Sequence, residues 1–182
     1  EDDVGYDICR STDGINFYVV GTTFVPGTGF CISAMKINPF GVILWSKIIG
    51  IDSERTSIAL SVAPTPDGGC IFTGDWDEPF TMKLNPDGIT GWFKQYSASD
   101  YYSHLFHIEP TSDGGYIACG RSHLVAAYIL KVNSTGDLQW QRDVYYGYFK
   151  AYYWVTEAIG GGYLTLSDSL VGTPNNYKPE IG

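Results

Sequence analysis

The chain has 182 residues, with 11 basic and 20 acidic side chains and a formal net charge of −9 at pH 7. This balance argues against nucleic acid as a partner, because phosphates attract a basic surface, and against electrostatic docking on anionic lipid. Apolar residues make up 44% of the chain, which argues against intrinsic disorder, and no apolar run is long enough to cross a bilayer. We therefore expect a single folded domain over residues 1–182, with no membrane insertion.

A repeated phrase organises the chain at a period of about 47 residues. Each copy carries one Lys, and these are Lys36, Lys83 and Lys131, separated by 47 and 48 residues. Nine residues after each Lys comes a Trp: Trp45, Trp92 and Trp140. A period near 47 is typical of propeller blades or another array. The period predicts repeats at roughly 1–50, 51–97, 98–144 and 145–182, of which the last is incomplete.

Each repeat predicts four short strands, called a to d in chain order. Strand a is the alternating segment at 4–9, 58–63, 104–109 and 152–156. Strand b follows at 17–20, 70–73, 116–119 and 163–166, and strand c at 31–37, 80–84 and 127–132. Strand d runs through the repeated Trp. Asp-Gly or Gly-Gly between strands a and b is a hairpin signal, and no helix-period segment competes, so the expected fold is all-β.

The turn between strands c and d has the most explicit local chemistry. It begins with Asn38, Asn85 and Asn133, and each is followed three residues later by Gly. Asn at the first position, Pro at the second and Gly at the fourth favour a type I turn. We therefore expect a structural role for the repeated Asn, and we expect each repeated Trp to wedge between neighbouring sheets.

The pattern Asp-Gly-Gly-Tyr-Ile…Gly, with the tail Lys-x-Asn-x-x-Gly-x-x-x-Trp, resembles the repeats of secreted bacterial and archaeal β-propellers. Its Gly-x-x-x-Trp part, at Gly41–Trp45, Gly88–Trp92 and Gly136–Trp140, looks like the tryptophan-docking motif of quinoprotein-like propellers. The resemblance covers nearly the whole chain. It implies three complete four-stranded β-propeller-type blades plus a partial fourth, but little about function, because propellers carry many activities.

The incomplete fourth repeat bears on assembly. Strands a and b are expected there, with only a remnant of strand c near 176–178. An unpaired sheet edge exposes backbone N–H and C=O groups and invites another chain. We therefore expect the chain to complete itself against a neighbour, forming rings or filaments. The alternatives are a fragment of a longer chain with further blades, and a compact four-bladed monomer.

Four cysteines are present, and none forms a Cys-x-x-Cys pair, so a zinc site is not expected. Cys9 and Cys31, both in the first repeat, form the candidate disulfide. Cys70 and Cys119 lie on equivalent strands, where we expect them to fill the core.

Metal-ligand candidates are weak. The acidic loop containing Asp75, Asp77 and Glu78 could hold Ca²⁺, but the other copies lack equivalent acids, so a solvated loop is preferred. His104 and His107 lie three apart on a strand, where they are expected to face opposite sides and not to chelate one ion.

Aromatic residues are densest in the last connection between repeats. The candidates for a glycan-stacking platform or a subunit interface are Tyr145, Tyr146, Tyr148, Tyr152, Tyr153 and Trp154, with Tyr101 and Tyr102 one repeat earlier. Packing between sheets is an equally open interpretation. Asn133-Ser134-Thr135 is an N-glycosylation sequon on an exposed turn, although the turn alone explains the Asn.

No catalytic residue stands out, because no nucleophile elbow is present and the chain has only three His. We expect a non-enzymatic structural protein, extracellular or at the cell surface, that forms a homo-oligomer or filament by completing its propeller between subunits. The alternative is an adhesin- or lectin-like module that binds carbohydrate or protein. A third interpretation is a fragment of a quinoprotein-like enzyme, although no cofactor motif is present.

Overall fold

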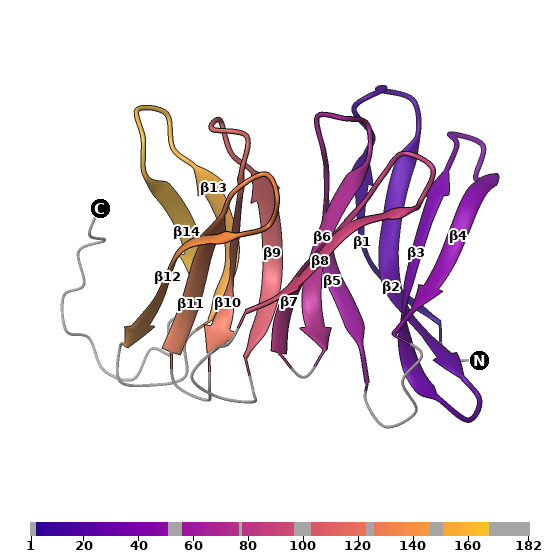
Figure 1. The fold of residues 1–182 in the computed structure, drawn as a ribbon, viewed down its shortest axis with the longest axis horizontal. Coiled ribbons are helices and arrows are strands. Elements are labelled where there is room, and N and C mark those ends of the chain that lie inside the picture. The colour runs from indigo at the N-terminus through magenta and orange to yellow at the C-terminus, as the bar shows by residue number, and fades with distance from the viewer. Residues whose placement is uncertain are drawn as a thin grey trace.

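The computed structural model describes residues 3–50, 56–76, 78–96, 103–122, 126–145 and 151–167, with only the backbone described at residue 145. In these residues, strands form four antiparallel sheets that follow one another along the long axis of the molecule (Figure 1). Sheets 1, 2 and 3 each have four strands in sequence order, and two strands of sheet 4 are described. The all-β expectation and the repeat of four-stranded units are therefore confirmed.

The strands have the following bounds. Sheet 1 contains β1 (Val4–Arg10), β2 (Phe17–Val25), β3 (Gly29–Ile37) and β4 (Ile43–Ile49). Sheet 2 contains β5 (Ile58–Pro64), β6 (Cys70–Trp76), β7 (Glu78–Leu84) and β8 (Thr90–Gln95). Sheet 3 contains β9 (His104–Pro110), β10 (Tyr116–Ser122), β11 (Ala126–Val132) and β12 (Leu138–Tyr145). Sheet 4 contains β13 (Tyr152–Glu157) and β14 (Tyr163–Ser167).

The turns before β4, β8 and β12 form as their sequence predicts. The carbonyl of Asn38, Asn85 or Asn133 accepts the N–H of the Gly three residues on, at 3.0, 2.9 and 3.0 Å. That Gly has a φ of 77–80° in all three turns, in the left-handed region that favours glycine. The three turns thus share one backbone geometry, which is compatible with a structural role for the repeated Asn.

The repeated Lys pairs with the Asp of the first hairpin turn of its own sheet. The pairs are Lys36–Asp13, Lys83–Asp67 and Lys131–Asp113. Lys131 is the most buried, and its Nζ also donates to the carbonyl of Val132 and to Gln139 Oε1, so its charge is satisfied. The pair ties the strand a–b turn to the third strand in each complete sheet.

The first strand of every sheet contains a β-bulge. In the four first strands, β1, β5, β9 and β13, one residue is skipped in the pairing with the second strand. The skipped residues are Tyr6, Leu60, Phe106 and Tyr153. These first strands lie next to one another along the array, and we call them the inner strands.

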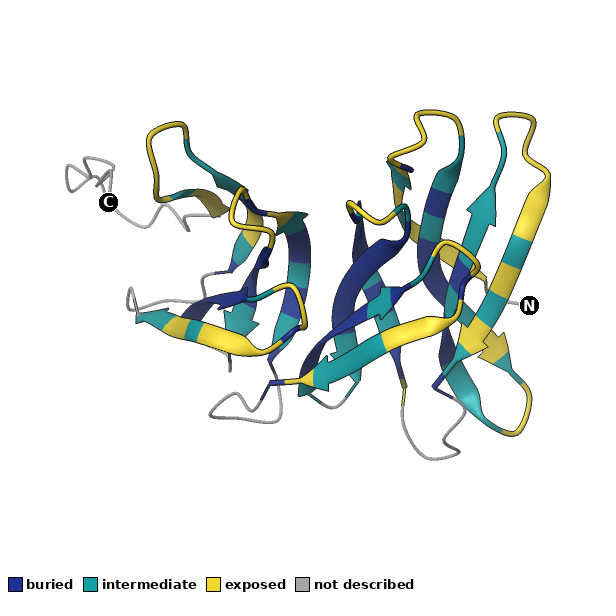
Figure 2. Ribbon diagram, turned by 45° about the horizontal axis from the view of Figure 1, so that its top comes forward, coloured by how far each residue is buried: buried dark blue, intermediate teal, exposed yellow. Residues whose placement is uncertain are grey.

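Each sheet has a back face, turned towards the preceding sheet, and a front face, turned towards the following one. Three apolar clusters fill the spaces between sheets 1 and 2, 2 and 3, and 3 and 4. Burial is concentrated in the middle strands, and exposed residues gather on the outer strands β4, β8 and β12 (Figure 2). The cores are therefore interfaces between sheets, and each sheet depends on its neighbours.

The candidate disulfide between Cys9 and Cys31 is wrong. Both thiols are free, as are Cys70 and Cys119. Cys9 lies on β1 opposite Tyr18, and Cys31 lies on β3 opposite Thr23, so the two are separated by two strand spacings and by five residues along β2, roughly 20 Å in all. A disulfide needs Cα atoms within about 7 Å. The expectation that Cys70 and Cys119 fill the core is confirmed, because both are buried.

Candidate functional site

The inner strands are joined by a ladder of side-chain hydrogen bonds between sheets. In each case the acceptor is the side chain of the residue that directly follows the bulge. The donor is a backbone N–H in the next sheet, two residues after the bulge of that sheet. The acceptors are Asp7 Oδ2, Ser61 Oγ and His107 Nδ1. The donors are Val62, Ile108 and Val155, at 2.8, 3.4 and 3.3 Å. These donors lie on the unpaired edge of their sheets, so the ladder satisfies N–H groups that would otherwise be buried without partners.

Asp7 fills two places in this ladder. Its Oδ2 accepts from Val62 in sheet 2, and its Oδ1 accepts the N–H of Ile8 at 2.8 Å. Ile8 holds the donor position in sheet 1, equivalent to Val62, Ile108 and Val155 in the other sheets. Sheet 1 therefore satisfies its own edge donor from within.

His107 links sheet 3 to sheet 4 as a neutral ring. Its Nδ1 accepts from Val155, its Nε2 lies 3.8 Å from Glu109 Oε1, and its ring stacks on Trp154 with 3.7 Å between centroids. Burial lowers the pKa of His107 from 6.5 to about 4, although the charge of Asp7 opposes this. The ring therefore stays an acceptor at neutral pH.

Trp154 occupies the acceptor position in sheet 4. It is equivalent to Asp7, Ser61 and His107, but an indole has one N–H donor and no acceptor. Its side chain is 51% exposed. The ladder therefore ends at sheet 4.

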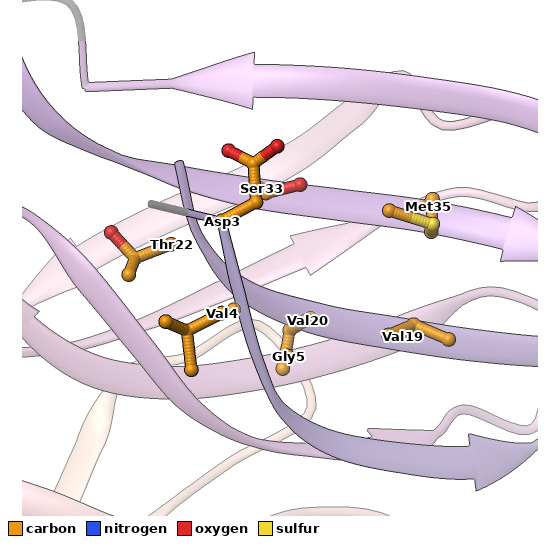
Figure 3. Close-up of a pocket in the computed structure, with 9 residues that line it drawn as sticks. Asp3, Val4, Gly5, Val19, Val20, Thr22, Ser33 and Met35 are labelled. Atoms are coloured by element: carbon orange, nitrogen blue, oxygen red, sulfur yellow. The ribbon is translucent and has the colours of Figure 1, made fainter. Parts of the chain in front are cut away.

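The back face of sheet 1 is apolar and uncovered. Ile8 is 55% exposed, whereas its equivalents Val62, Ile108 and Val155 are buried against the preceding sheet. Beside it on the same face lie Val19 of β2 and Met35 of β3, which are paired across the strands and border a small hollow of about 100 Å³ (Figure 3). Figure 3 shows Asp3 and Ser33 at the polar end of this hollow.

The front face of sheet 4 is also apolar and exposed. Leu164 and Leu166 are 54% and 65% exposed. The residues equivalent to Leu166 are Val20, Thr73 and Cys119, and those equivalent to Leu164 are Tyr18, Ile71 and Ile117; all six are buried. Both ends of the array thus present faces of the kind that the interior sheets cover.

Two of the repeated tryptophans dock on the next sheet, as predicted. Trp45 donates its Nε1 proton to the carbonyl of Pro86 at 3.0 Å and lies over Gly88. Trp92 lies over Gly136, where an added Cβ would be 2.6 Å from the ring. Gly41, the equivalent glycine of sheet 1, has no neighbouring atom within 4 Å of an added Cβ. The docking position on sheet 1 is therefore open.

A groove of about 350 Å³ follows the inner strands. It is bordered by residues of β1, β5 and β9 and by Trp154 of β13. Its ionisable groups are the thiol of Cys9, the carboxyls of Asp7 and Glu109 and the imidazole of His107, and no Lys or Arg among the described residues borders it. The groove thus combines one half-exposed indole with carboxylates and apolar walls.

Comparison with known proteins supports the fold alone. No protein-family model and no curated protein matches the chain. The chain is similar to a crystal structure of a protein of unknown function from Bacteroides caccae, with a TM-score of 0.59 and 11% sequence identity. The match covers 91% of this chain and 53% of the other, so this chain spans about half the length of that one. None of the described segments forms an apolar helix of membrane-spanning length.

The structure separates the aromatic candidates. Tyr152 packs against the cluster between sheets 3 and 4, whereas Tyr153 and Trp154 are about half exposed at the inner strands. Tyr153 stacks on Phe106, with 5.5 Å between ring centroids. The side chain of Tyr145 and all of Tyr101, Tyr102, Tyr146 and Tyr148 lie outside the described residues. Both interpretations of the aromatic run, packing and exposed surface, therefore apply to different members.

Other predicted residues have local roles. Asn133 Oδ1 accepts the N–H groups of Thr135 and Asp137, and its glycosylation stays a prediction. Asp75 contacts His104 Nδ1 at 2.9 Å, Glu78 begins β7, and Asp77 lies outside the described residues. His104 and His107 have different partners. Trp140 packs against Tyr163 of sheet 4.

Proposed function

We propose that this chain is a non-enzymatic structural protein of an extracellular or cell-surface assembly, built from propeller-type blades. The repeat of antiparallel four-stranded sheets supports an arrangement of three complete blades and a partial fourth. The chain joins further sheets through the two uncovered faces at the ends of its array.

One observation carries this proposal. Ile8 on the back face of sheet 1 is 55% exposed, although the same position is buried in every other sheet. The transfer of an exposed apolar side chain from water into a contact is favourable by roughly 25 cal/mol per Å². An apolar face of this kind marks an interaction surface. The open position at Gly41, where the interior sheets receive a Trp, supports the same conclusion.

The assembly state tests the proposal. We expect light scattering and electron microscopy to show particles larger than the 20.1 kDa chain. Ile8→Lys introduces a charge on the uncovered face and is expected to abolish association. Ile89→Lys, on a residue that is 57% exposed in the turn before β8, is the matched control and should associate normally. A wild-type protein that stays a single chain at every concentration contradicts the proposal.

Ligand binding in the inner groove is a second candidate function. The exposed indole of Trp154 beside the carboxylate of Glu109 offers a stacking surface and a hydrogen-bond acceptor, as a carbohydrate requires. We expect a glycan panel to identify a ligand whose affinity falls at least ~10-fold in Trp154→Ala. Leu164→Ala, outside the groove, should bind as the wild type does. Retention of no glycan, or equal affinity in Trp154→Ala, rules this function out.

A further inference from the structure

The identity of the partner at the end faces follows from the ladder of the inner strands. At each interior interface, the earlier sheet supplies an acceptor and the later sheet supplies a backbone N–H. Any sheet added to either end must either continue this ladder or leave a polar group without its bond. The two ends of the array show which choice applies.

Both ends lack the group that the ladder needs. On sheet 1, the N–H of Ile8 is already bonded to Asp7 Oδ1 at 2.8 Å. On sheet 4, Trp154 stands where Asp7, Ser61 and His107 provide an acceptor, and it provides none. At the ladder positions of the described residues, the array therefore has no free donor at its back end and no acceptor at its front end.

An ordinary repeat sheet fits neither end. If such a sheet packed on the front face of sheet 4, it would bury an N–H equivalent to that of Ile108 without an acceptor. If it packed on the back face of sheet 1, its acceptor would meet an N–H that Asp7 already binds. Buried polar groups without partners are disfavoured. Sheet 4 against sheet 1 is the combination that leaves neither group unpaired.

The apolar surfaces of the two faces also match. The first and third interior interfaces join the front-face position of Leu166 to the back-face position of Ile8, as Val20 and Val62 do in the first cluster and Cys119 and Val155 in the third. Leu166 and Ile8 are both more than half exposed here, and sheets 1 and 4 lie towards opposite ends of the long axis (Figure 1). In this arrangement the two faces of one copy do not meet each other.

We propose that the front face of sheet 4 in one copy packs on the back face of sheet 1 in a second copy, head to tail. This inference rests on the proposed function, because it names the partner for the same uncovered faces. Such a contact is heterologous, so it produces a closed ring or a fibre according to the rotation between copies.

A mixing experiment tests the pairing. Ile8→Lys alters the back face of sheet 1, and Leu166→Lys alters the front face of sheet 4. We expect each variant alone to be a single chain by light scattering. An equimolar mixture should form two-chain particles, because one intact front face then meets one intact back face. Tagging each variant differently shows that such particles contain one of each. The double variant, Ile8→Lys with Leu166→Lys, should stay a single chain.

The outcomes separate the two proposals. If Leu166→Lys alone still forms particles and Ile8→Lys does not, two sheet 1 faces meet each other; the inference is then wrong and the proposed function stands. If neither variant disrupts association, the contact lies elsewhere and the inference is wrong. A wild-type chain that never associates overturns both. Circular dichroism and thermal melting of Ile8→Lys and Leu166→Lys, with Ile89→Lys as control, establish that each variant is folded.

Discussion

A single residue position decides how neighbouring sheets are linked. Asp7, Ser61 and His107 share no side-chain chemistry except the ability to accept a hydrogen bond, and all three accept from the next sheet. Nothing in the repeat pattern of the sequence marks this position, because the residue types differ in every copy. The backbone register after the bulge is what makes them equivalent.

His107 at this position makes the free energy of unfolding depend on pH. The pKa of His107 is about 4 in the folded protein, against 6.5 for an unperturbed histidine. Between these values the unfolded chain binds the proton more readily, so the free energy of unfolding falls as the pH drops from 6.5 to 4. The loss is complete below about 4 and amounts to at most roughly 3 kcal/mol. We expect His107→Gln, which keeps an acceptor without titrating, to flatten the stability curve over this window.

Urea unfolding at several pH values between 4 and 7 measures this effect. Asp7 and Glu109 lie near the ring and are present in both proteins, so the comparison changes His107 alone. A constant difference in unfolding free energy between His107→Gln and the wild type across this range contradicts the prediction.

The bulge shapes each sheet at the scale of its strands. It brings the carbonyl of the first strand against a glycine of the second, at Gly21, Gly74 and Gly120. A Cβ on any of these would lie 1.8–1.9 Å from a backbone oxygen of the inner strand. The glycine within the second strand of sheets 1, 2 and 3 is therefore required by close backbone approach, not by a turn.

The pair Gly5 and Gly21 isolates this effect, because the two residues face each other across β1 and β2. In Gly21→Ala the Cβ would lie 1.9 Å from the carbonyl oxygen of Val4, so the strands must separate. We expect a loss of more than about 3 kcal/mol in unfolding free energy. In Gly5→Ala the nearest atom is Val19 Cγ1 at 4.0 Å, and the change should stay within about 0.5 kcal/mol. Thermal denaturation measures both, and equal melting temperatures for the two variants contradict the prediction.

The sequence predicted most features of the strands and turns, but it did not predict the bulge. Turn chemistry and alternation predicted the strands, the Asn turns and the docking tryptophans, because each depends on residues close together in the chain. The bulge escaped, because one extra residue in a strand barely disturbs a short alternating pattern. Because the bulge was not predicted, the sequence could not show that Tyr153 and Trp154 are exposed while Tyr152 packs between sheets. It also could not show that His107 occupies the acceptor position of the ladder. The lysine at a fixed position in each repeat was recognised, but its Asp partner was not.

At the scale of the whole molecule, the described sheets form an array with two unlike ends. Its interior sheets depend on neighbours on both sides, as the three clusters between sheets show. The period near 47 predicted this arrangement, because repeats must stack to bury their faces. It could not predict which faces remain open, since exposure depends on where the array stops in space. Nor could spacing alone exclude the Cys9–Cys31 bridge, which fails because β2 lies between the two strands.

The ladder along the inner strands also has a mechanical meaning. Tension along the array would load three side-chain links of the inner strands, and these differ in kind: a carboxylate at Asp7, a hydroxyl at Ser61 and a neutral imidazole at His107. Bonds to a charged acceptor are roughly twice as strong as bonds between neutral groups. Within the ladder, the link between sheets 1 and 2 is therefore the firmest. Where sheet 4 joins, the carboxylate of Glu157 accepts the N–H and the hydroxyl proton of Ser112 at 2.6 and 2.8 Å, so the neutral His107 link does not bear the load alone.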